Sequence, residues 1–343
     1  MSLKTLLFQS HTMVLGWSAI QQLFPPHSFS TMPNLTYSKL LLIFLLEWPL
    51  FASSAPTSPA GPSSSSSQTV DSWFRQHFIV DSTCNTQHGE IEKGFSDIFV
   101  LAEVVQHISE DSVPYQHYFL SRKEDPHELD IVQNMAKSIL VNGNSNKKIT
   151  IKCPITSIGG VATTTCRETD SPEISLSSLY FKFPTFSSKP FTKEGWCTPP
   201  PHKLVQFIPR AQIGYHEITH FEHIVKYAQE LSAVTVDARV RTNKRGTFDF
   251  ILYETSSGTP LTGSQSVQIL PKQWKDYLSG NIPKPNYYPD EVAQSHALAA
   301  VETFFYQKCQ PYGWDPNQVF VPGTKDLQSD PKHDYHAKKT NSG

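Results

Sequence analysis

Residues 209–225 read PRAQIGYHEITHFEHIV, and the motif His216-Glu217-Ile218-Thr219-His220 within them decides how the whole chain is interpreted. Histidines at positions i and i+4 of a helix lie on one face, a single turn apart, so both imidazoles can bind the same metal ion. Pro209 favours a helix that begins here, because proline suits the first helical turn. The stretch therefore predicts a helix that presents two metal ligands.

Glu217 follows the first of these histidines and is the candidate catalytic residue. A carboxylate at this position can take a proton from a zinc-bound water and pass it to the leaving amine of a peptide. The metal supplies Lewis acidity and lowers the pKa of its water toward neutrality. The competing interpretation is a solvated helix face with incidental histidines, since the HExxH pattern occurs by chance in roughly one such chain in forty.

A catalytic zinc ion needs a third protein ligand and one open coordination position. Lys226 occupies the place where an extended HExxHxxGxxH motif requires histidine, and His223 lies only three residues beyond His220. Glu230 and Glu254 lack the sequence context of a glutamate ligand. We expect His223 to lie beside the site or on the surface rather than on the metal.

An aspartate is the remaining type of third ligand. Residues 246–249 read GTFD, and a carboxylate on such a tight loop below the helix can complete a tetrahedral site. Asp237 is the competing acid, and both aspartates also have the simpler interpretation of a loop carboxylate. The motif favours Asp249.

The rest of the chain alternates helical and strand patterns. Apolar residues recur at helical spacing over 88–108 and again over 131–139, where the Asn142-Gly143 pair ends the second helix. Residues 148–153 (KITIKC) alternate and are β-branched, which is typical of a strand. The other predicted elements are strands within 160–186, one of them over 176–183, an extended loop over 187–204, and a last helix over 289–308.

Composition and the N-terminal pattern narrow the class of protein. The formal net charge of -2 argues against a nucleic-acid-binding protein, which usually has a basic excess. Residues 40–46 (LLLIFLL) form a short apolar run with Lys39 before it and small residues at 52–55 after it, which is typical of a cleaved signal peptide. A signal anchor or a buried helix is the alternative. Five cysteines in a secreted chain suggest two disulfides and one remaining thiol.

These features divide the chain into four parts. Residues 1–55 form an N-terminal extension with the signal peptide, and residues 56–69 form a linker rich in serine and proline. Residues 70–322 form one domain, and the polar residues 323–343 form a disordered tail.

Four further segments occur in an order that is informative together with HEITH and GTFD. They are CNTQHGEIEKGFSDIFVLAEVV (84–105), VPYQHYFL (113–120), DIVQNMAKSILVNGNSNKKITIKC (130–153) and YYPDEVAQSHALAAVETFFY (287–306). In these segments the chain resembles the deuterolysin or aspzincin family, which includes the fungal lysine-specific metallo-endopeptidase domains. The resemblance covers residues 80–309.

The resemblance implies an α+β, mainly helical fold, a zincin-like metallopeptidase domain with a small sheet and an HExxH active-site helix. It implies that His216 and His220 bind zinc, that Glu217 is the general base and that Asp249 is the third ligand. The implied cofactor is one Zn2+ per chain.

The family motif continues as Gly-Thr-x-Asp-x-x-Tyr-Gly, whereas here Tyr253 comes one residue late and the closing glycine is missing. Tyr253 is the candidate for a phenol that hydrogen-bonds the developing oxyanion. The resemblance also implies that Cys84 pairs with Cys153. On such a fold, a bond between Cys197 and Cys309 would tie the proline-rich loop to the last helix.

We therefore expect a secreted, extracellular zinc metallo-endopeptidase that hydrolyses peptide bonds with a water activated by Glu217. The alternative is a catalytically inactive secreted relative that acts as a binding protein. We expect protein or peptide substrates, no nucleic acid, no stable membrane association after signal cleavage, and a monomer.

Overall fold

The computed structural model of the chain describes residues 66–153, 161–165, 172–200, 202, 204–232, 246–249, 252–254, 263–315 and 335–337. The fold is α+β and mainly helical. The α-helices are α2 (Ser66–His77), α3 (His88–Val105), α4 (Val113–Tyr118), α5 (Glu128–Leu140), α6 (Arg210–Thr219), α7 (Glu222–Leu231), α8 (Gly263–Leu278) and α9 (Ala293–Cys309). The strands are β1 (Phe78–Val80), β2 (Ile149–Lys152), β3 (Ala162–Thr165), β4 (Glu173–Leu176), β5 (Leu252–Glu254) and β6 (Tyr335–Ala337).

The two helices predicted from apolar periodicity are present as α3 and α5. Phe95 and Ile98 of α3 are fully buried, as is the apolar face of α5 around Met135. The chain leaves α5 at Asn142 and Gly143, whose φ angles are 50° and 60°. These angles lie in the left-handed region that asparagine and glycine tolerate best, which confirms the Asn-Gly pair as the end of the helix.

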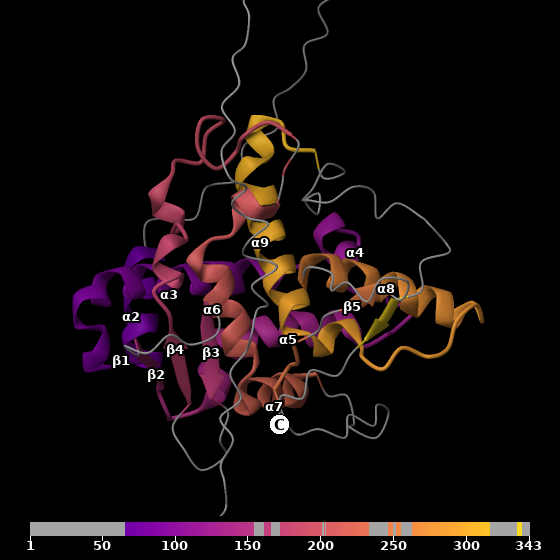
Figure 1. Cartoon of the computed structure of the whole chain (residues 1–343), viewed down its shortest axis with the longest axis horizontal. Helices are drawn as coiled ribbons and strands as arrows, with labels where there is room; N and C mark the ends of the chain where they lie inside the picture. Colours follow the sequence, from indigo (N-terminus) through magenta and orange to yellow (C-terminus); the bar gives the residue numbers. More distant parts are fainter. Residues whose placement is uncertain are drawn as a thin grey trace, which may run out of the picture.

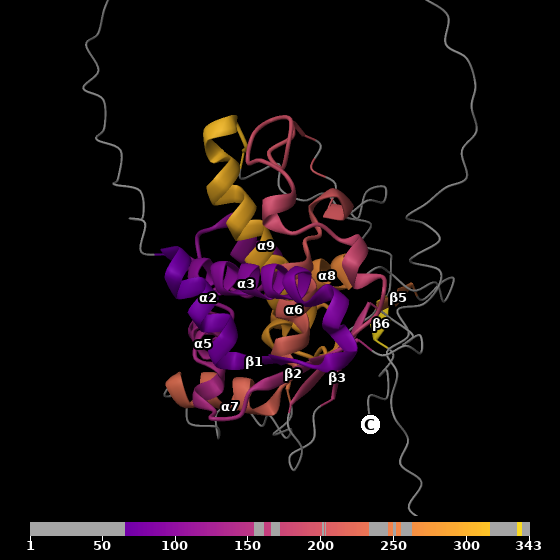
Figure 2. The same cartoon turned by 90° about the vertical axis from the view of Figure 1, so that its left-hand side faces the viewer.

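A small mixed sheet places strands from distant parts of the chain side by side. Its order is β1-β2-β4-β3, with β1, β2 and β4 parallel and β3 antiparallel to β4. Figure 1 shows these strands in that order, and β3 is the one nearest to α6. Figure 2 shows α3 and α6 on the same side of the strands. Because β3 ends the sheet within the described residues, the helix with the HEITH motif lies beside an edge strand.

The strand predicted over 176–183 is wrong beyond its first residue. β4 ends at Leu176, and a turn follows in which Ser177 Oγ accepts the amide of Leu179 and the Ser177 carbonyl accepts the amide of Tyr180. A 3-10 helix then runs over Tyr180–Lys182. The serine side chain binds the nearby backbone and competes with sheet pairing, an effect that the apolar pattern alone does not reveal.

The last predicted helix is present as a 3-10 turn, Pro289–Glu291, followed by α9. Helix α9 is buried along almost its whole length, and Phe304 and Phe305 join one aromatic cluster with Phe186 and Trp196. In Figure 1, α9 stands between the sheet on one side and α4 and α8 on the other. It is therefore the central helix of the hydrophobic core.

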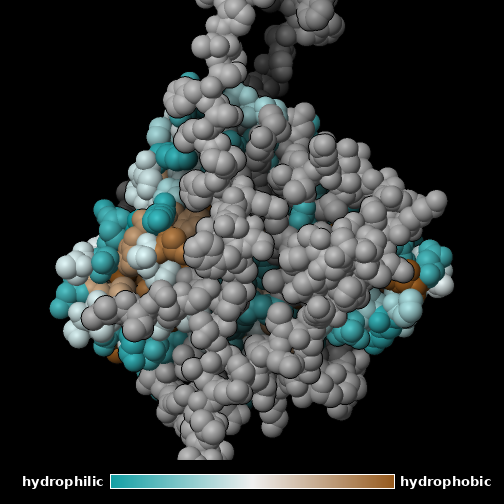
Figure 3. Space-filling model, viewed as in Figure 1, coloured by the Kyte–Doolittle hydropathy of each residue, from teal (hydrophilic) through white to brown (hydrophobic). Residues whose placement is uncertain are grey.

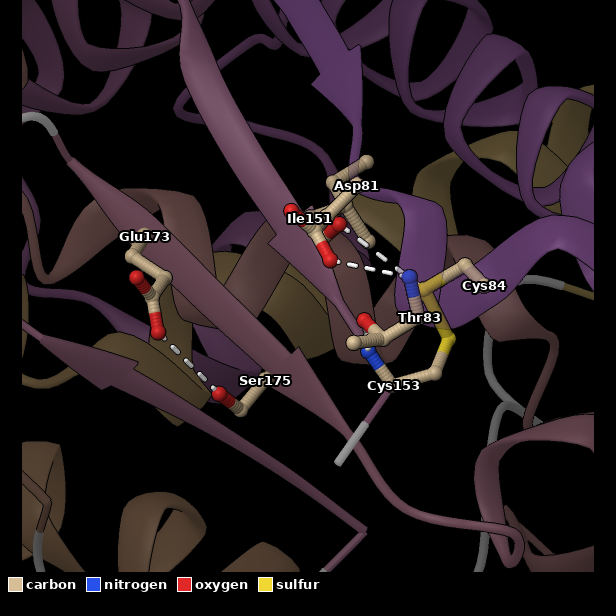
Figure 4. Close-up of a disulfide and its surroundings, with 7 residues drawn as sticks. All are labelled: Asp81, Thr83, Cys84, Ile151, Cys153, Glu173 and Ser175. Atoms are coloured by element: carbon tan, nitrogen blue, oxygen red, sulfur yellow. Dashed lines mark hydrogen bonds between the residues drawn. A yellow bond between two sulfur atoms is a disulfide. The ribbon is translucent and has the colours of Figure 1, made fainter. Parts of the chain in front are cut away.

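Both predicted disulfides are present. Cys84–Cys153 joins the segments that follow two parallel strands, β1 and β2, and the Cys153 amide also donates to Thr83 Oγ1 (3.1 Å; Figure 4). Cys197–Cys309 joins the proline-rich loop to the end of α9, as we hypothesised for this fold. Two disulfides are compatible with a secreted protein.

On the described part of the face in Figure 3, exposed apolar residues lie among polar ones. In Figure 3, brown apolar atoms over the side of α2 and α3 alternate with teal polar ones. Among the described residues, the most exposed large apolar side chains are those of Leu278 at the end of α8 and Ile79 of β1, each about half exposed. None of the helices in the described part of the chain combines the length and the apolar character needed to cross a membrane.

Several predictions concern the two ends of the chain, and most of the residues involved lie outside the described ones. The signal peptide and residues 56–65 of the predicted linker lie outside the described residues, and α2 begins at Ser66. Within the predicted tail, residues 335–337 form β6, which pairs with β5. Cys166 also lies outside the described residues.

Candidate metal centre

Helix α6 is held firmly at its N-terminus. Pro209 takes the position before the first helical residue, with extended φ and ψ angles of -83° and 162°. The side chain of Arg210 is buried there; it pairs with Glu90 and donates to the carbonyl of Phe181 (2.7 Å). These contacts fix the helix that carries the HEITH motif against α3 and the segment after β4.

Three side chains converge at the C-terminal end of α6. The Nε2 atoms of His216 and His220 lie 3.2 Å apart. Asp249 Oδ1 lies 3.0 Å from Nε2 of His216 and 3.4 Å from Nε2 of His220. The structure thus brings the two predicted histidines together with the favoured aspartate, whereas the competing Asp237 lies outside the described residues.

The spacing of these three atoms fits a tetrahedral metal ion. Zinc binds imidazole nitrogen and carboxylate oxygen at about 2.0–2.2 Å, so two ligands of a regular tetrahedron lie about 3.3 Å apart. The observed separations of 3.0, 3.2 and 3.4 Å lie around that value. Within the described part of the chain, no fourth Asp, Glu, His or Cys joins the group, so it has the three protein ligands of a catalytic site. The group can hold a metal ion.

The turn that carries Asp249 is fastened to two helices. On one side, the Thr247 amide donates to the Thr219 carbonyl (3.0 Å), and the two threonine hydroxyls lie 2.8 Å apart. On the other side, the Phe248 amide donates to the carbonyl of Glu291, and the Phe248 carbonyl accepts the amide of Ala293 (2.8 and 3.0 Å). The main chain therefore sets the position of Asp249 relative to both α6 and α9.

Gly246 allows the turn to approach α6 this closely. A Cβ atom at this position would lie only 1.8 Å from the carbonyl oxygen of His220. That oxygen belongs to the main chain, so it cannot move aside as a flexible side chain could. The first residue of the GTFD motif is thus a steric requirement of the site.

The ring of His220 is oriented by a second contact. Its Nδ1 lies 2.8 Å from the Thr247 carbonyl, which can only accept a hydrogen bond, so the proton of the neutral ring sits on Nδ1. Nε2 then offers a lone pair toward Asp249 and His216. Metal-binding histidines are commonly fixed by such a contact at the other ring nitrogen. The Nδ1 atom of His216 is buried and has no hydrogen-bond partner among the described residues.

The charges at the centre favour a cation. Burial lowers the pKa of His220, but the neighbouring charges of Asp249 and Glu217 outweigh it and raise the pKa from 6.5 to about 9. Burial raises the pKa of Asp249, yet the two histidines hold it well below its ordinary value. Without a metal, a proton takes the positive charge that this site stabilises; a divalent cation would displace that proton.

Glu217 lies on the same turn as the two histidines and is almost fully buried. Its carboxylate accepts a hydrogen bond from Thr164 of β3, with Oγ1 at 2.6 Å from Oε2. The same hydroxyl lies 3.0 Å from the main-chain carbonyl of Glu217. The predicted base is therefore placed between the histidine pair and the edge strand of the sheet.

Two other predictions concern residues around the centre. Tyr253 lies in β5, where its main chain pairs with His336, but the position of its side chain is outside what the structure describes. His223 is not part of the converging group and meets Asn142 Oδ1 at 3.1 Å. Burial, together with the charge of Lys147, lowers the pKa of His223 to about 4. Among the described residues, the group that could hold a metal ion therefore does not include His223.

Thr164, Thr219 and Thr247 are the residues that the sequence analysis missed. Thr219 and Thr247 lie inside the HEITH and GTFD motifs, so their proximity to the ligands is visible in the sequence, although their contact with each other is not. Thr164 lies 53 positions before Glu217, in a run of three threonines with no local sign of function.

The sequence matches no model of a known protein family and is similar to no curated protein.

Proposed function

We propose that this protein is a secreted zinc metallo-endopeptidase of the deuterolysin or aspzincin type. The observation that carries the proposal is the convergence of His216, His220 and Asp249 at tetrahedral spacing, with the buried carboxylate of Glu217 on the same helical turn. An incidental HExxH sequence has no reason to meet a third ligand that 28 intervening residues separate from it. The sequence resemblance and the two disulfides are consistent with this assignment.

The residues of the chain divide the chemistry among themselves. His216, His220 and Asp249 would hold the metal, and a bound zinc ion would supply Lewis acidity toward water and the peptide carbonyl. Glu217 takes a proton from the attacking water and passes it to the leaving amine. Tyr253 is the proposed donor to the developing oxyanion.

The edge strand beside Glu217 suits an extended peptide. β3 ends the described sheet, and its Thr164 touches Glu217, so this edge runs directly past the proposed base. An extended chain that adds to a sheet edge is held by main-chain hydrogen bonds, which are independent of sequence. Such a peptide would lie with its backbone close to Glu217, and this favours an endopeptidase over an enzyme for small molecules.

The second candidate is a secreted binding protein without catalytic activity. It is favoured by the altered end of the GTFD motif, where Tyr253 comes one residue late. In that case the metal would stabilise the fold only. Glu217 separates the two candidates, because a structural site has no need of a buried carboxylate beside its ligands.

The test is metal content and casein hydrolysis of the mature protein and of its Glu217→Gln variant. We expect about one zinc per chain in both proteins and a loss of hydrolysis of at least about 1000-fold in the variant, because the amide cannot accept the proton. Elemental analysis for iron and other metals in the same samples checks the identity of the ion. Zinc with equal activity in both proteins, or no hydrolysis by either, would contradict the proposal.

A further inference from the structure

One contact of Glu217 is not explained by the fold or by the metal ligands. Thr164 lies on β3, and its hydroxyl approaches the carboxylate of Glu217, a residue that is only 3% exposed. Among the described residues, the hydrogen bond to this carboxylate goes to Oε2. A buried carboxylate in a protein interior requires such a donor, because burial without one is costly. Oε1 is left as the oxygen that can meet a water molecule.

We propose that Thr164 is a positioning residue for Glu217, and this inference rests on the proposed function. By holding Oε2 at 2.6 Å, the hydroxyl fixes the rotation of the carboxylate and directs Oε1 to the place where the water is deprotonated. The donor comes from a strand and the acceptor from a helix, so the geometry is set by two rigid elements rather than by a loop.

The same hydroxyl can serve Glu217 before and after proton transfer. It has one proton, and the shorter contact shows that the carboxylate is its preferred acceptor over the main-chain carbonyl at 3.0 Å. A hydrogen bond to a charged carboxylate is stronger than one to a neutral carboxylic acid. The contact therefore weakens when Glu217 takes the proton of the water and regains its strength when that proton leaves with the amine.

The experiment compares Thr164→Val and Thr164→Ser with the wild-type protein. Valine keeps the β-branched shape and removes the donor, so we expect kcat to fall about 10- to 100-fold. KM should stay within about twofold, and zinc content should be unchanged, because neither substrate binding nor the ligands are altered. Serine restores the hydroxyl and should recover most of kcat.

Thr163→Val is the matched control. Thr163 is the neighbouring threonine of β3 and points to the opposite face of the strand, so its loss should leave kcat unchanged. Wild-type kcat in Thr164→Val, or an equal loss in Thr163→Val, would overturn the inference. A loss in Thr164→Ser as large as in the valine variant would do the same, because it would show damage to the strand rather than loss of a donor.

A spectroscopic readout separates this inference from the proposed function. In protein with 13C-labelled glutamate, Thr164→Val should shift one carboxylate band in the infrared spectrum, and the shift should vanish when both proteins carry Glu217→Gln. If the band shifts but the wild-type protein hydrolyses no casein, the contact between Thr164 and Glu217 exists. The proposed function, and with it the positioning role, would then be overturned. Hydrolysis without the band shift would overturn the inference alone.

Discussion

Two clusters in the interior of this molecule place a histidine against a carboxylate, one around Asp249 and one around Glu302. In the second cluster, Nδ1 of His117 on α4 lies 2.7 Å from Oε1 of Glu302 on α9. Glu302 is fully buried, whereas His117 is about one-third exposed. Tyr118 lies beside the same carboxylate. Glu302 thus meets groups that can donate protons.

The cluster around Asp249 differs in the ring nitrogen that carries the proton of its histidine. The Thr247 carbonyl keeps the proton of the neutral His220 ring on Nδ1, so Nε2 turns a lone pair toward the carboxylate. Two atoms that both accept hydrogen bonds repel each other unless a positive charge lies between them. The comparison teaches that distance alone does not identify a metal site. The decisive feature is that, with one proton of His220 on Nδ1, three acceptor atoms converge and need a cation, either a proton or a metal ion, between them.

The largest expected effect is on metal affinity in Asp249→Ala. Removing one of three ligands should weaken zinc binding by more than about 100-fold, since the loss of a mere supporting contact already costs about 10- to 100-fold. Chelator competition followed by elemental analysis measures this. Glu302→Gln is the matched variant from the other cluster and should bind zinc as the wild type does. Equal losses in both variants would remove the distinction between the clusters.

A smaller effect is expected from Gly246→Ala, which tests the main chain of the site. The added Cβ would meet the His220 carbonyl oxygen at 1.8 Å, so the turn with Asp249 must move. We expect the free energy of unfolding, measured in urea, to fall by about 1–3 kcal/mol. Zinc binding should weaken as well. Gly89→Ala is the control: Gly89 is exposed in the first turn of α3 with no atom within 4 Å of the added carbon. A neutral result for Gly246→Ala would show that the turn adapts freely.

The smallest effect concerns stability at the second cluster. Burial lowers the pKa of His117, but the hydrogen bond and the charge of Glu302 outweigh it and raise the pKa above the ordinary value of 6.5. A raised pKa in the folded state stabilises the fold fully below pH 6.5, and this contribution is lost as pH rises through the folded-state pKa. Glu302→Gln should therefore cost about 1–2 kcal/mol at pH 6 and less at pH 9.

Urea denaturation of wild type and Glu302→Gln at both pH values measures this difference. A cost that grows with pH would contradict the assignment of His117 and Glu302 as an ion pair.

The sequence was sufficient to predict those features of the structure that depend on residues close together in the chain. The amphipathic pattern of α3 and α5 follows from residues three and four apart, and the Asn142-Gly143 pair supplies the left-handed turn that ends α5. The histidine pair is likewise local, because one helical turn brings the rings together. Asp249 could be chosen over Asp237 only because glycine and threonine precede it in a recognisable motif.

Contacts between distant segments could not be obtained in this way. The register of β1 on β2 pairs Phe78 with Ile149, and nothing near either residue specifies the other. Helices α2, α4, α7 and α8 were not predicted; α8 even contains Pro271, which by local criteria argues against a helix. The contact between Thr164 and Glu217 is of the same distant kind.

The attachment of the Asp249 turn to α9 has a consequence for the order in which the protein is made. The turn is bonded to Glu291 and Ala293, so one of its two attachments forms only once this later part of the chain is present. A ribosome adds residues one at a time from the N-terminus. While it is still short of position 293, the growing chain already contains both histidines and Glu217 but lacks the support that aligns Asp249. The unfinished polypeptide has only the bonds between Thr219 and Thr247 to hold the turn, and the second attachment is added once synthesis has passed that point.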